Sequence, residues 1–145
     1  MVGILERKID DKNRVQFPAS LKNEMGNHLF ISLGFDGNAE IRSASDFSKY
    51  VAVMENQSSF NKQARVLKRA ILGNTVEVML DASGRMLFPK LLIEKLAIQK
   101  DIYFVGVGSI VELWSKERYD DFMSEISDEE ISLIAQNFSL RGDNE

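Results

Sequence analysis

The stretch 9–21, IDDKNRVQFPASL, recurs as 80–92, LDASGRMLFPKLL, at an offset of 71 residues. The match aligns two D-x-x-x-R motifs, each followed by Phe-Pro, and it pairs the only two prolines of the chain. After a one-residue insertion the similarity continues at an offset of 72 and pairs Gly34 with Gly106, Glu40 with Glu112, and Phe47 with Tyr119. Repetition over about 50 residues indicates two copies of one structural unit.

Both copies have the same order of segments, which predicts a ββαββα unit. An apolar run leads into a polar turn, DDKN or DASG, and then into a second short run, RVQF or RMLF. Asp suits such hairpin turns because its carboxylate accepts backbone N–H groups, and Asn or Gly tolerates the left-handed conformation. Pro18 and Pro89 then suit the first turn of a short helix. Two strands and an amphipathic helix follow, with the closing helices expected at residues 46–55 and 116–126. Ser43 or Ser45 is the candidate N-cap of the first closing helix and Ser115 that of the second.

Each copy alone has about 70 residues and four short strands, which make a thin hydrophobic core. Interleaving the strands of both copies buries more apolar surface. We therefore expect an α+β, strand-rich fold, a barrel or sandwich with a pseudo-twofold axis and peripheral helices. The expected organisation is a first repeat at residues 1–55, a linker helix within 56–72, a second repeat at 73–126, and a C-terminal helix and acidic tail at 127–145.

The C-terminal helix is predicted from a capping box and a stripe of apolar residues. Ser127 and Glu130 have the capping-box spacing, and the stripe consists of Ile131, Ile134, Ala135 and Phe138. Such a helix needs an apolar partner. The sequence leaves open whether that partner is the body of its own chain or another subunit.

Composition and charge narrow the classes of function. The 145 residues are 44% hydrophobic and 28% charged, and the formal net charge is -4. That charge is polarised, with a net +3 on residues 1–72 and a net -7 on residues 73–145. The absence of cysteine excludes disulfides and thiolate sites, and a single histidine, His28, argues against a histidine-rich metal site. No apolar stretch approaches the roughly 20 residues of a membrane span. We expect a cytoplasmic protein without a membrane, cofactor or small-molecule partner.

The duplicated D-x-x-x-R motif is the principal candidate for function. Its Asp can cap the turn and accept a hydrogen bond from its Arg, which stiffens the loop and aims a guanidinium outward. This arrangement has two interpretations, a purely structural turn lock or a rigid contact for phosphates and guanine edges. Cations gathered around the first motif favour the DNA-binding interpretation, namely Arg7, Lys8, Lys12 and Arg14.

The linker segment 58–72 is predicted to form an amphipathic helix with one basic side. At 100° per residue, its apolar residues fall opposite a basic face formed by Lys62, Arg65, Lys68 and Arg69. This face is either a solvated surface, a secondary contact to phosphates, or a site of pairing with acidic residues of a neighbouring subunit.

These motifs together resemble the MraZ family. The resemblance rests on the two D-x-x-x-R-x-x-x-P motifs, the R-x-x-x-R spacing of Arg65 and Arg69, and the segment 105–122, VGVGSIVELWSKERYDDF. It implies tandem SpoVT-AbrB-like swapped-hairpin modules in a pseudo-dimeric barrel, and homo-oligomeric rings, commonly octamers. It also implies nucleoid-associated, sequence-specific binding to tandem direct repeats in promoter DNA. Regulation, usually repression, would then act on the family member's own operon and on the division and cell-wall gene cluster.

By this resemblance Asp10 and Asp81 orient their loops. The second motif has Ala82 and Ser83 and lacks a basic residue at these positions, so we expect the first loop to dominate affinity. The candidate DNA-binding residues are Arg7, Lys8, Lys12, Asn13, Arg14 and Arg85. Candidates for a secondary DNA or subunit contact are Lys62, Arg65 and Arg69.

Two other classes of function compete with DNA binding. Two Asp residues related by a pseudo-twofold are typical of an aspartic protease dyad. Each Asp here has an Arg four residues on, which lowers a carboxyl pKa and keeps the group ionised, so we expect no enzyme activity. The stronger alternative is an AbrB-like, antitoxin-like oligomer whose loops or C-terminal helix bind another protein.

Overall fold

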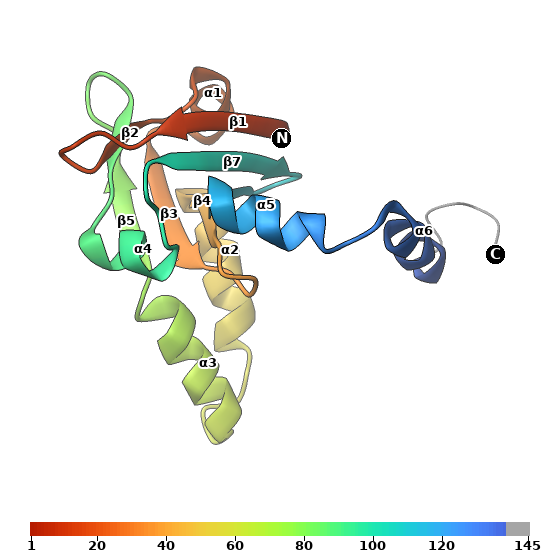
Figure 1. Cartoon of the computed structure of the whole chain (residues 1–145). Coiled ribbons are helices and arrows are strands. Elements are labelled where there is room, and N and C mark those ends of the chain that lie inside the picture. Colours follow the sequence, from red (N-terminus) through yellow and green to blue (C-terminus); the bar gives the residue numbers. More distant parts are fainter. Residues whose placement is uncertain (139–145) are drawn as a thin grey trace.

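The computed structural model describes residues 1–138 and confirms an α+β fold with the same element order in both copies (Figure 1). The acidic tail expected at the C-terminus falls partly on residues 139–145, which lie outside the described residues. The elements are β1 (Val2–Lys8), β2 (Arg14–Gln16), α1 (Ala19–Met25), β3 (His28–Leu33), β4 (Ala39–Ser43), α2 (Ala44–Glu55), α3 (Lys62–Leu72), β5 (Val76–Met79), β6 (Arg85–Leu87), α4 (Lys90–Lys95), β7 (Asp101–Val107), β8 (Val111–Ser115), α5 (Lys116–Ser124) and α6 (Asp128–Asn137).

The sheets confirm the pseudo-twofold axis. An antiparallel six-stranded sheet has the order β1-β7-β8-β4-β3-β5, and β2 pairs with β6 in a separate two-stranded ribbon. Because β5 to β8 repeat β1 to β4, the six-stranded order is the same read from either edge. The axis passes between equivalent residues, since Glu40 faces Glu112 across β4 and β8, and Val15 faces Met86 across β2 and β6.

Strand exchange joins the two copies. β1 pairs with β7 of the second copy, and β5 pairs with β3 of the first. The polar turns after β1 and β5 form as predicted, closed by hydrogen bonds from Asp10 N–H to the Arg14 carbonyl and from Asp81 N–H to the Arg85 carbonyl. The strands that flank each turn nevertheless belong to different sheets, so simple hairpin pairing is wrong for both copies. Pairing across the copies completes one sheet that neither copy completes by itself.

The alignment of Gly34 with Gly106 is also wrong, by one residue. Leu33 pairs with Ala39 in the first copy, whereas Gly106 pairs with Val111 in the second. Ala39 and Val111 are equivalent at the offset of 72, so Leu33 is the counterpart of Gly106. A second insertion therefore precedes the β3 and β7 strands, and glycine identity alone gave the misleading match.

One hydrophobic core lies between the sheet, the ribbon and the short helices α1 and α4. The aromatic residue before each proline anchors it, since Phe17 and Phe88 are each only 1% exposed. Phe17 packs edge-on against Phe104 of the other copy, with ring centroids 5.3 Å apart. The β2–β6 ribbon is fixed to this core by Val15 and Met86, which are fully buried.

The closing helices cover the outer face of the sheet through equivalent aromatic contacts. Phe47 of α2 stacks on Phe30 at 4.4 Å, and Tyr119 of α5 meets Tyr103 at 5.3 Å. Both helices begin at the predicted serines, because the Oγ atoms of Ser43 and Ser115 accept the N–H groups of Asp46 and Arg118.

The linker helix starts later than the apolar pattern predicts. Asn61 caps it by accepting the Ala64 N–H at 3.2 Å, so the helix begins at Lys62. α2 and α3 project together from the body, whereas α6 stands beyond the end of α5 (Figure 1). Ser127 caps α6 by accepting the Glu130 N–H. Within residues 1–138, no helix has the length and apolar character required to cross a bilayer.

Candidate nucleic-acid interface

The first D-x-x-x-R turn is a compact loop organised around one carboxylate. Asp10 Oδ1 accepts the backbone N–H groups of Lys12 at 2.9 Å and Arg14 at 2.8 Å. Its Oδ2 accepts the Nε–H of the Arg14 side chain at 3.0 Å. Asn13 adopts a left-handed backbone with φ of 61°, which Asn tolerates better than most residues. The loop therefore fixes both the backbone and the base of the guanidinium.

The second turn repeats this geometry with different side chains. Asp81 Oδ1 accepts the N–H groups of Ser83 and Arg85, both at 2.9 Å, and Oδ2 accepts the Arg85 Nε–H at 3.0 Å. Gly84 takes the left-handed position, with φ of 80°. The chemistry of the carboxylate is thus the same in both copies, while Ala82 and Ser83 leave the second loop without a cation at its tip.

These hydrogen bonds stabilise the ionised carboxylates. The Arg14 backbone N–H is the largest influence holding the pKa of Asp10 below its ordinary value of 3.8, with Lys12 N–H and the Arg14 side chain acting in the same direction. The Arg85 backbone N–H likewise lowers the pKa of Asp81. An aspartic protease dyad instead requires one carboxyl whose pKa is raised by its neighbour. Two separately paired carboxylates whose pKa values are both lowered do not provide that acid.

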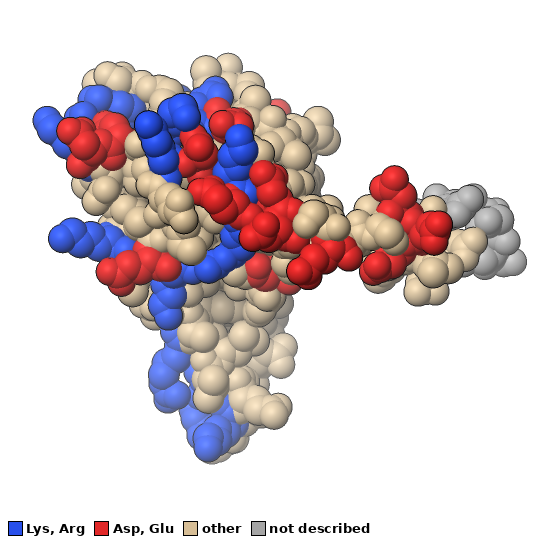
Figure 2. Space-filling model, viewed as in Figure 1, with Lys and Arg blue, Asp and Glu red and all other residues tan. Residues whose placement is uncertain are grey.

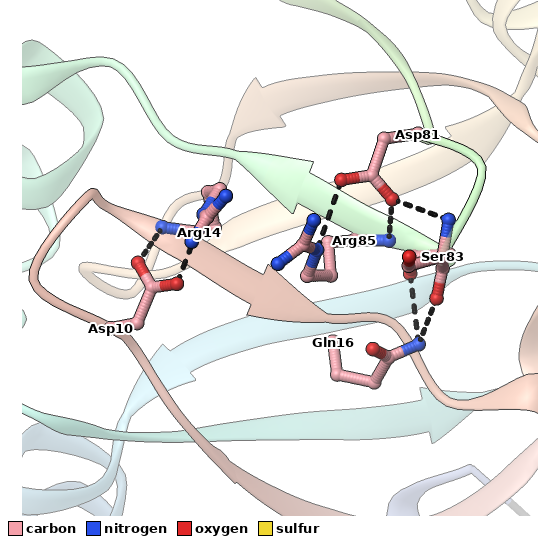
Figure 3. A network of polar contacts seen from close by, with 7 residues as sticks. Asp10, Arg14, Gln16, Asp81, Ser83 and Arg85 are labelled. Atoms are coloured by element: carbon pink, nitrogen blue, oxygen red, sulfur yellow. Dashed lines mark hydrogen bonds and ion pairs between the residues drawn. The ribbon is translucent and has the colours of Figure 1, made fainter.

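The ribbon places both arginines on one solvent-facing surface, shown from close by in Figure 3. Alternate residues of a strand share a face, and Val15 and Met86 occupy the buried face of the ribbon. Arg14 lies opposite Leu87, and Gln16 lies opposite Arg85. These four side chains therefore share the outer face. The arginines are diagonal neighbours, a relation that separates Cα atoms by roughly 7–8 Å.

Each arginine has donor capacity to spare for a ligand. The guanidinium Nε is occupied by its Asp, and neither terminal nitrogen donates a hydrogen bond within residues 1–138. The Arg14 and Arg85 side chains are 31% and 35% exposed. A guanidinium held at its base with both terminal NH₂ groups available suits bidentate contacts to phosphate or to the O6 and N7 atoms of guanine.

Gln16 is a member of this surface that the sequence analysis missed. Its Nε2 donates to the carbonyls of Ser83 at 2.8 Å and Gly84 at 3.3 Å, so β2 of the first copy braces the turn of the second. Leu87 occupies the equivalent place on β6 and has no amide to return the contact. The signal available in the sequence was the period-2 spacing from Arg14, which places position 16 on the same face.

The other predicted DNA-binding cations of the first copy, Arg7, Lys8 and Lys12, differ in the contacts that their side chains make. Lys12 is exposed at the tip of its turn. Lys8 forms an ion pair with Asp101 at 2.7 Å, and its hydrogen bond is the largest influence lowering the pKa of that carboxyl. Arg7 donates to the Glu6 carbonyl at 2.7 Å. Unlike Arg7 and Lys8, Lys12 makes no side-chain hydrogen bond or ion pair within residues 1–138. Its ammonium group is therefore available to a ligand, as are the terminal nitrogens of Arg14 and Arg85.

The structure does not bring the basic face of α3 to these turns. The helix projects with α2 from a part of the body distant from the ribbon (Figure 1), and it carries the other predicted contact residues, Lys62, Arg65 and Arg69. Figure 2 shows Lys and Arg side chains along α3, and Asp and Glu side chains over α5 and α6. The cations thus lie in two separate places, on α3 and on the ribbon turns, where Asp10 and Asp81 pair with the arginines, while acidic side chains gather over α5 and α6 (Figure 2). Among the described residues, no cluster of His, Asp and Glu is suited to hold a metal ion.

Comparison with known proteins gives a consistent assignment. The family model described as "MraZ protein, putative antitoxin-like" matches residues 2–70 and again residues 71–141. Proteins named "Transcriptional regulator MraZ" are similar along nearly the whole chain. That of Mycoplasmopsis pulmonis is 42% identical, covering 93% of this chain and 92% of its own length. That of Ureaplasma parvum serovar 3 is 38% identical, covering 97% and 98%.

The relative from Mesoplasma florum is 37% identical and covers 87% of both chains. The duplicated match of the family model agrees with the pseudo-twofold fold, in which each copy contributes one D-x-x-x-R turn. These similarities extend over both repeats and are therefore not limited to one copy of the motif. The chain belongs to the MraZ family.

Proposed function

We propose that this protein is a sequence-specific DNA-binding transcription regulator that contacts DNA through the outer face of the β2–β6 ribbon. The observation that carries the proposal is the placement of Arg14 and Arg85 on one exposed surface, each held by a carboxylate. A rigid guanidinium loses little side-chain entropy when it binds. Lys12 and Asn13 extend the surface at the first turn, and Arg7 and Lys8 supply positive charge behind it.

The first turn is expected to dominate affinity because Lys12 stands where the second turn has Ser83. Residues 1–55 and 73–126 would then act as paired reading modules, joined by the linker at 56–72 and followed by an acidic segment at 127–145. An arginine that contacts a base edge is worth about 1–3 kcal/mol of binding free energy. Contacts to phosphate supply the remaining, salt-dependent part.

Self-association offsets the acidic net charge of -4. A homo-oligomeric ring that presents the ribbons on one side multiplies weak contacts, since each contact after the first is effectively intramolecular. Such a ring, an octamer by family resemblance, suits tandem direct repeats in a promoter. The proposed action is repression of the protein's own operon and of the division and cell-wall gene cluster. The expected location is the cytoplasm, in association with the nucleoid.

The test is a salt-titrated binding assay with the protein's own upstream DNA and a scrambled duplex. Arg14→Ala should weaken specific binding by roughly 5- to 150-fold, the range that corresponds to about 1–3 kcal/mol. Arg85→Ala should weaken it less. Lys49→Ala is the matched control, because this exposed cation lies on α2, away from the ribbon. Equal, weak binding to both duplexes by all four proteins would overturn the proposal.

The alternative is an antitoxin-like module whose main partner is another protein. One observation favours it, the exposed apolar stripe on α6 formed by Ile131, Ile134 and Phe138. Changes at Ile134 should then abolish partner binding, while Arg14→Ala leaves it intact. The Arg14→Ala variant separates the two functions, because it changes the ribbon and leaves the apolar stripe of α6 intact.

A further inference from the structure

α6 is a capped helix whose apolar residues face solvent. Every residue of Asp128–Asn137 is exposed except Ala135, which is partly covered. Ile131 and Ile134 are 46% and 49% exposed, and Phe138, one turn further on, is 73% exposed. A helix of ten residues is marginal in water unless an apolar face packs against something. The helix therefore requires a surface that covers this stripe.

A groove of about 430 Å³ between α2 and α3 offers a matching surface. Its apolar lining comes from both helices and from the β3–β4 loop, with Val53, Leu67 and Phe35 substantially exposed. Met54 and Ile71 form a buried floor. Two helices that flank an apolar floor suit an amphipathic helix that inserts residues at spacings of three and four.

Charge favours α6 as the occupant. The first turn of α6 is wholly acidic, with Asp128, Glu129 and Glu130, and the helix has no basic residue. α3 is the reverse, with four cations and no acid, namely Lys62, Arg65, Lys68 and Arg69. Lys68 Nζ donates to the carbonyl of Gln57, a residue that lines the groove, at 3.4 Å, which places this cation at the rim. Opposite fields steer α6 toward α3, whereas two copies of α6 would bring like charges together.

The chain geometry favours a groove on a second molecule. Only residues 125–127 separate α5 from α6, and three residues span at most about 11 Å. α5 is fixed to the sheet through Tyr119, which contacts both Tyr103 and Trp114. Figure 1 shows α6 beyond the outer end of α5 and apart from the α2–α3 pair of the same chain.

We propose that α6 of one copy docks into the α2–α3 groove of a second copy. The inference deepens the self-association part of the proposed function and rests on it, but it does not require DNA binding. Because donor and acceptor surfaces differ, the contact is heterologous, and its repetition closes a ring or extends a filament. Lys68, at the edge of the groove, then has a subunit-pairing role that is separate from the DNA surface on the ribbon.

Disulfide cross-linking tests the contact directly, because the chain contains no native cysteine. Leu67→Cys and Ile134→Cys proteins are purified separately, mixed and oxidised. The expected product is a covalent heterodimer that contains one copy of each variant. A protein that carries both substitutions should give a ladder of covalent multimers. Ser132→Cys is the matched control, because Ser132 lies one residue after Ile131 and is therefore rotated by about 100° from it around the helix. This variant should cross-link to Leu67→Cys at least tenfold less.

Light scattering on the full-length protein supplies the second measurement. Ile134→Asp should raise the dissociation constant of self-association by roughly tenfold or more, because the substitution buries a charge in the interface. Ser132→Asp should leave it unchanged. An oligomeric protein without the Leu67–Ile134 cross-link, or with mainly Ile134–Ile134 or intrachain links, overturns the docking but not self-association. A monomeric wild type overturns both, and DNA binding is judged separately by its own assay.

Discussion

Asp10 and Asp81 each accept three hydrogen bonds, two from backbone N–H groups and one from an arginine side chain. The same carboxylate therefore shapes the turn and positions the guanidinium. The sequence predicted this pairing because both motifs recur with the same spacing and the same Phe-Pro. A turn lock and a DNA contact are compatible in this geometry, since the Asp uses only Nε and leaves the terminal nitrogens of Arg14 and Arg85 for a ligand.

Acid should loosen both turns. The folded-state pKa values of Asp10 and Asp81 lie below the ordinary 3.8, so their stabilisation is present above pH 3.8 and is lost as the pH falls through the lowered folded values. The variant Asp10→Asn/Asp81→Asn keeps acceptor oxygens but lacks the charges. It should be less stable than wild type at neutral pH, and the difference should narrow below pH 3.8.

Urea unfolding at a series of pH values, followed by the fluorescence of Trp114, measures this effect. Trp114 is the only tryptophan and is buried, so it reports on the core. The double variant should retain some acid dependence from Asp101, whose pKa is also lowered. Parallel stability curves for wild type and the double variant would contradict the assignment of this acid dependence to the turns.

Gln16 creates a difference between two otherwise equivalent turns. Gln16→Leu, which copies Leu87, removes the donor to the Ser83 and Gly84 carbonyls. It should cost about 0.5–1.5 kcal/mol, the usual net value of one hydrogen bond, with the lower end expected at this exposed site. Amide hydrogen exchange at residues 82–84 should accelerate, while exchange at residues 11–13 stays unchanged.

The reciprocal variant Leu87→Gln is the matched control for this bracing. Residues 12 and 13 are the counterparts of 83 and 84 at the offset of 71, and Phe88 N–H already bonds to the Asn13 carbonyl as Phe17 N–H bonds to Gly84. The new amide should slow exchange in the first turn. Identical exchange in all three proteins would show that the Gln16 contact does not brace the loop. Sequence comparison missed this residue because a repeat emphasises what the copies share.

Most individual elements followed from local sequence signals. Pro18 and Pro89 precede the short helices, and Ser43 and Ser115 cap the closing helices as predicted. Pairing between strands did not follow, because a strand three residues long, such as β2, carries no pattern that selects its neighbour. Its actual partner is β6, its equivalent across the pseudo-twofold.

Helix caps provide a stability test at the level of elements. Ser43→Ala removes the acceptor of the Asp46 N–H and should lower the free energy of unfolding by about 1 kcal/mol. Ser127→Ala removes the same kind of cap from α6. In protein dilute enough to be monomeric, α6 is exposed along its length, so this control should leave the unfolding midpoint of the core unchanged. Equal losses from both variants, measured by urea unfolding, would mean that α6 is coupled to the core.

At the scale of the whole molecule, duplication predicted the pseudo-twofold and the need for a shared core. It did not reveal that β1 and β5 would each become the edge of a sheet built mainly by other segments. The order of exchange depends on long-range packing, such as the contact of Phe17 with Phe104. Strand exchange also places the candidate surfaces apart, because the ribbon lies near the axis while α3 and α6 project from the body (Figure 1).

The exchanged strands predict that the two copies hold together without a covalent link. A protease site inserted between Ser58 and Ser59, in an exposed stretch, cuts the chain between α2 and α3. The β1–β7, β3–β5, β4–β8 and β2–β6 pairs all cross this cut. The fragments should therefore co-elute as one folded complex in native buffer, retain the buried fluorescence of Trp114, and separate only in denaturant.

The uncut protein with the same insertion is the control for effects of the inserted residues. Each fragment alone lacks the partner of an edge strand and half of the shared core, so it should be unfolded or should pair with a second copy of itself through the same strand exchange. Mixing the separated fragments should restore the complex, with a midpoint that depends on concentration. Independent folding of each fragment as a stable monomer would show that strand exchange contributes little to the stability of this molecule.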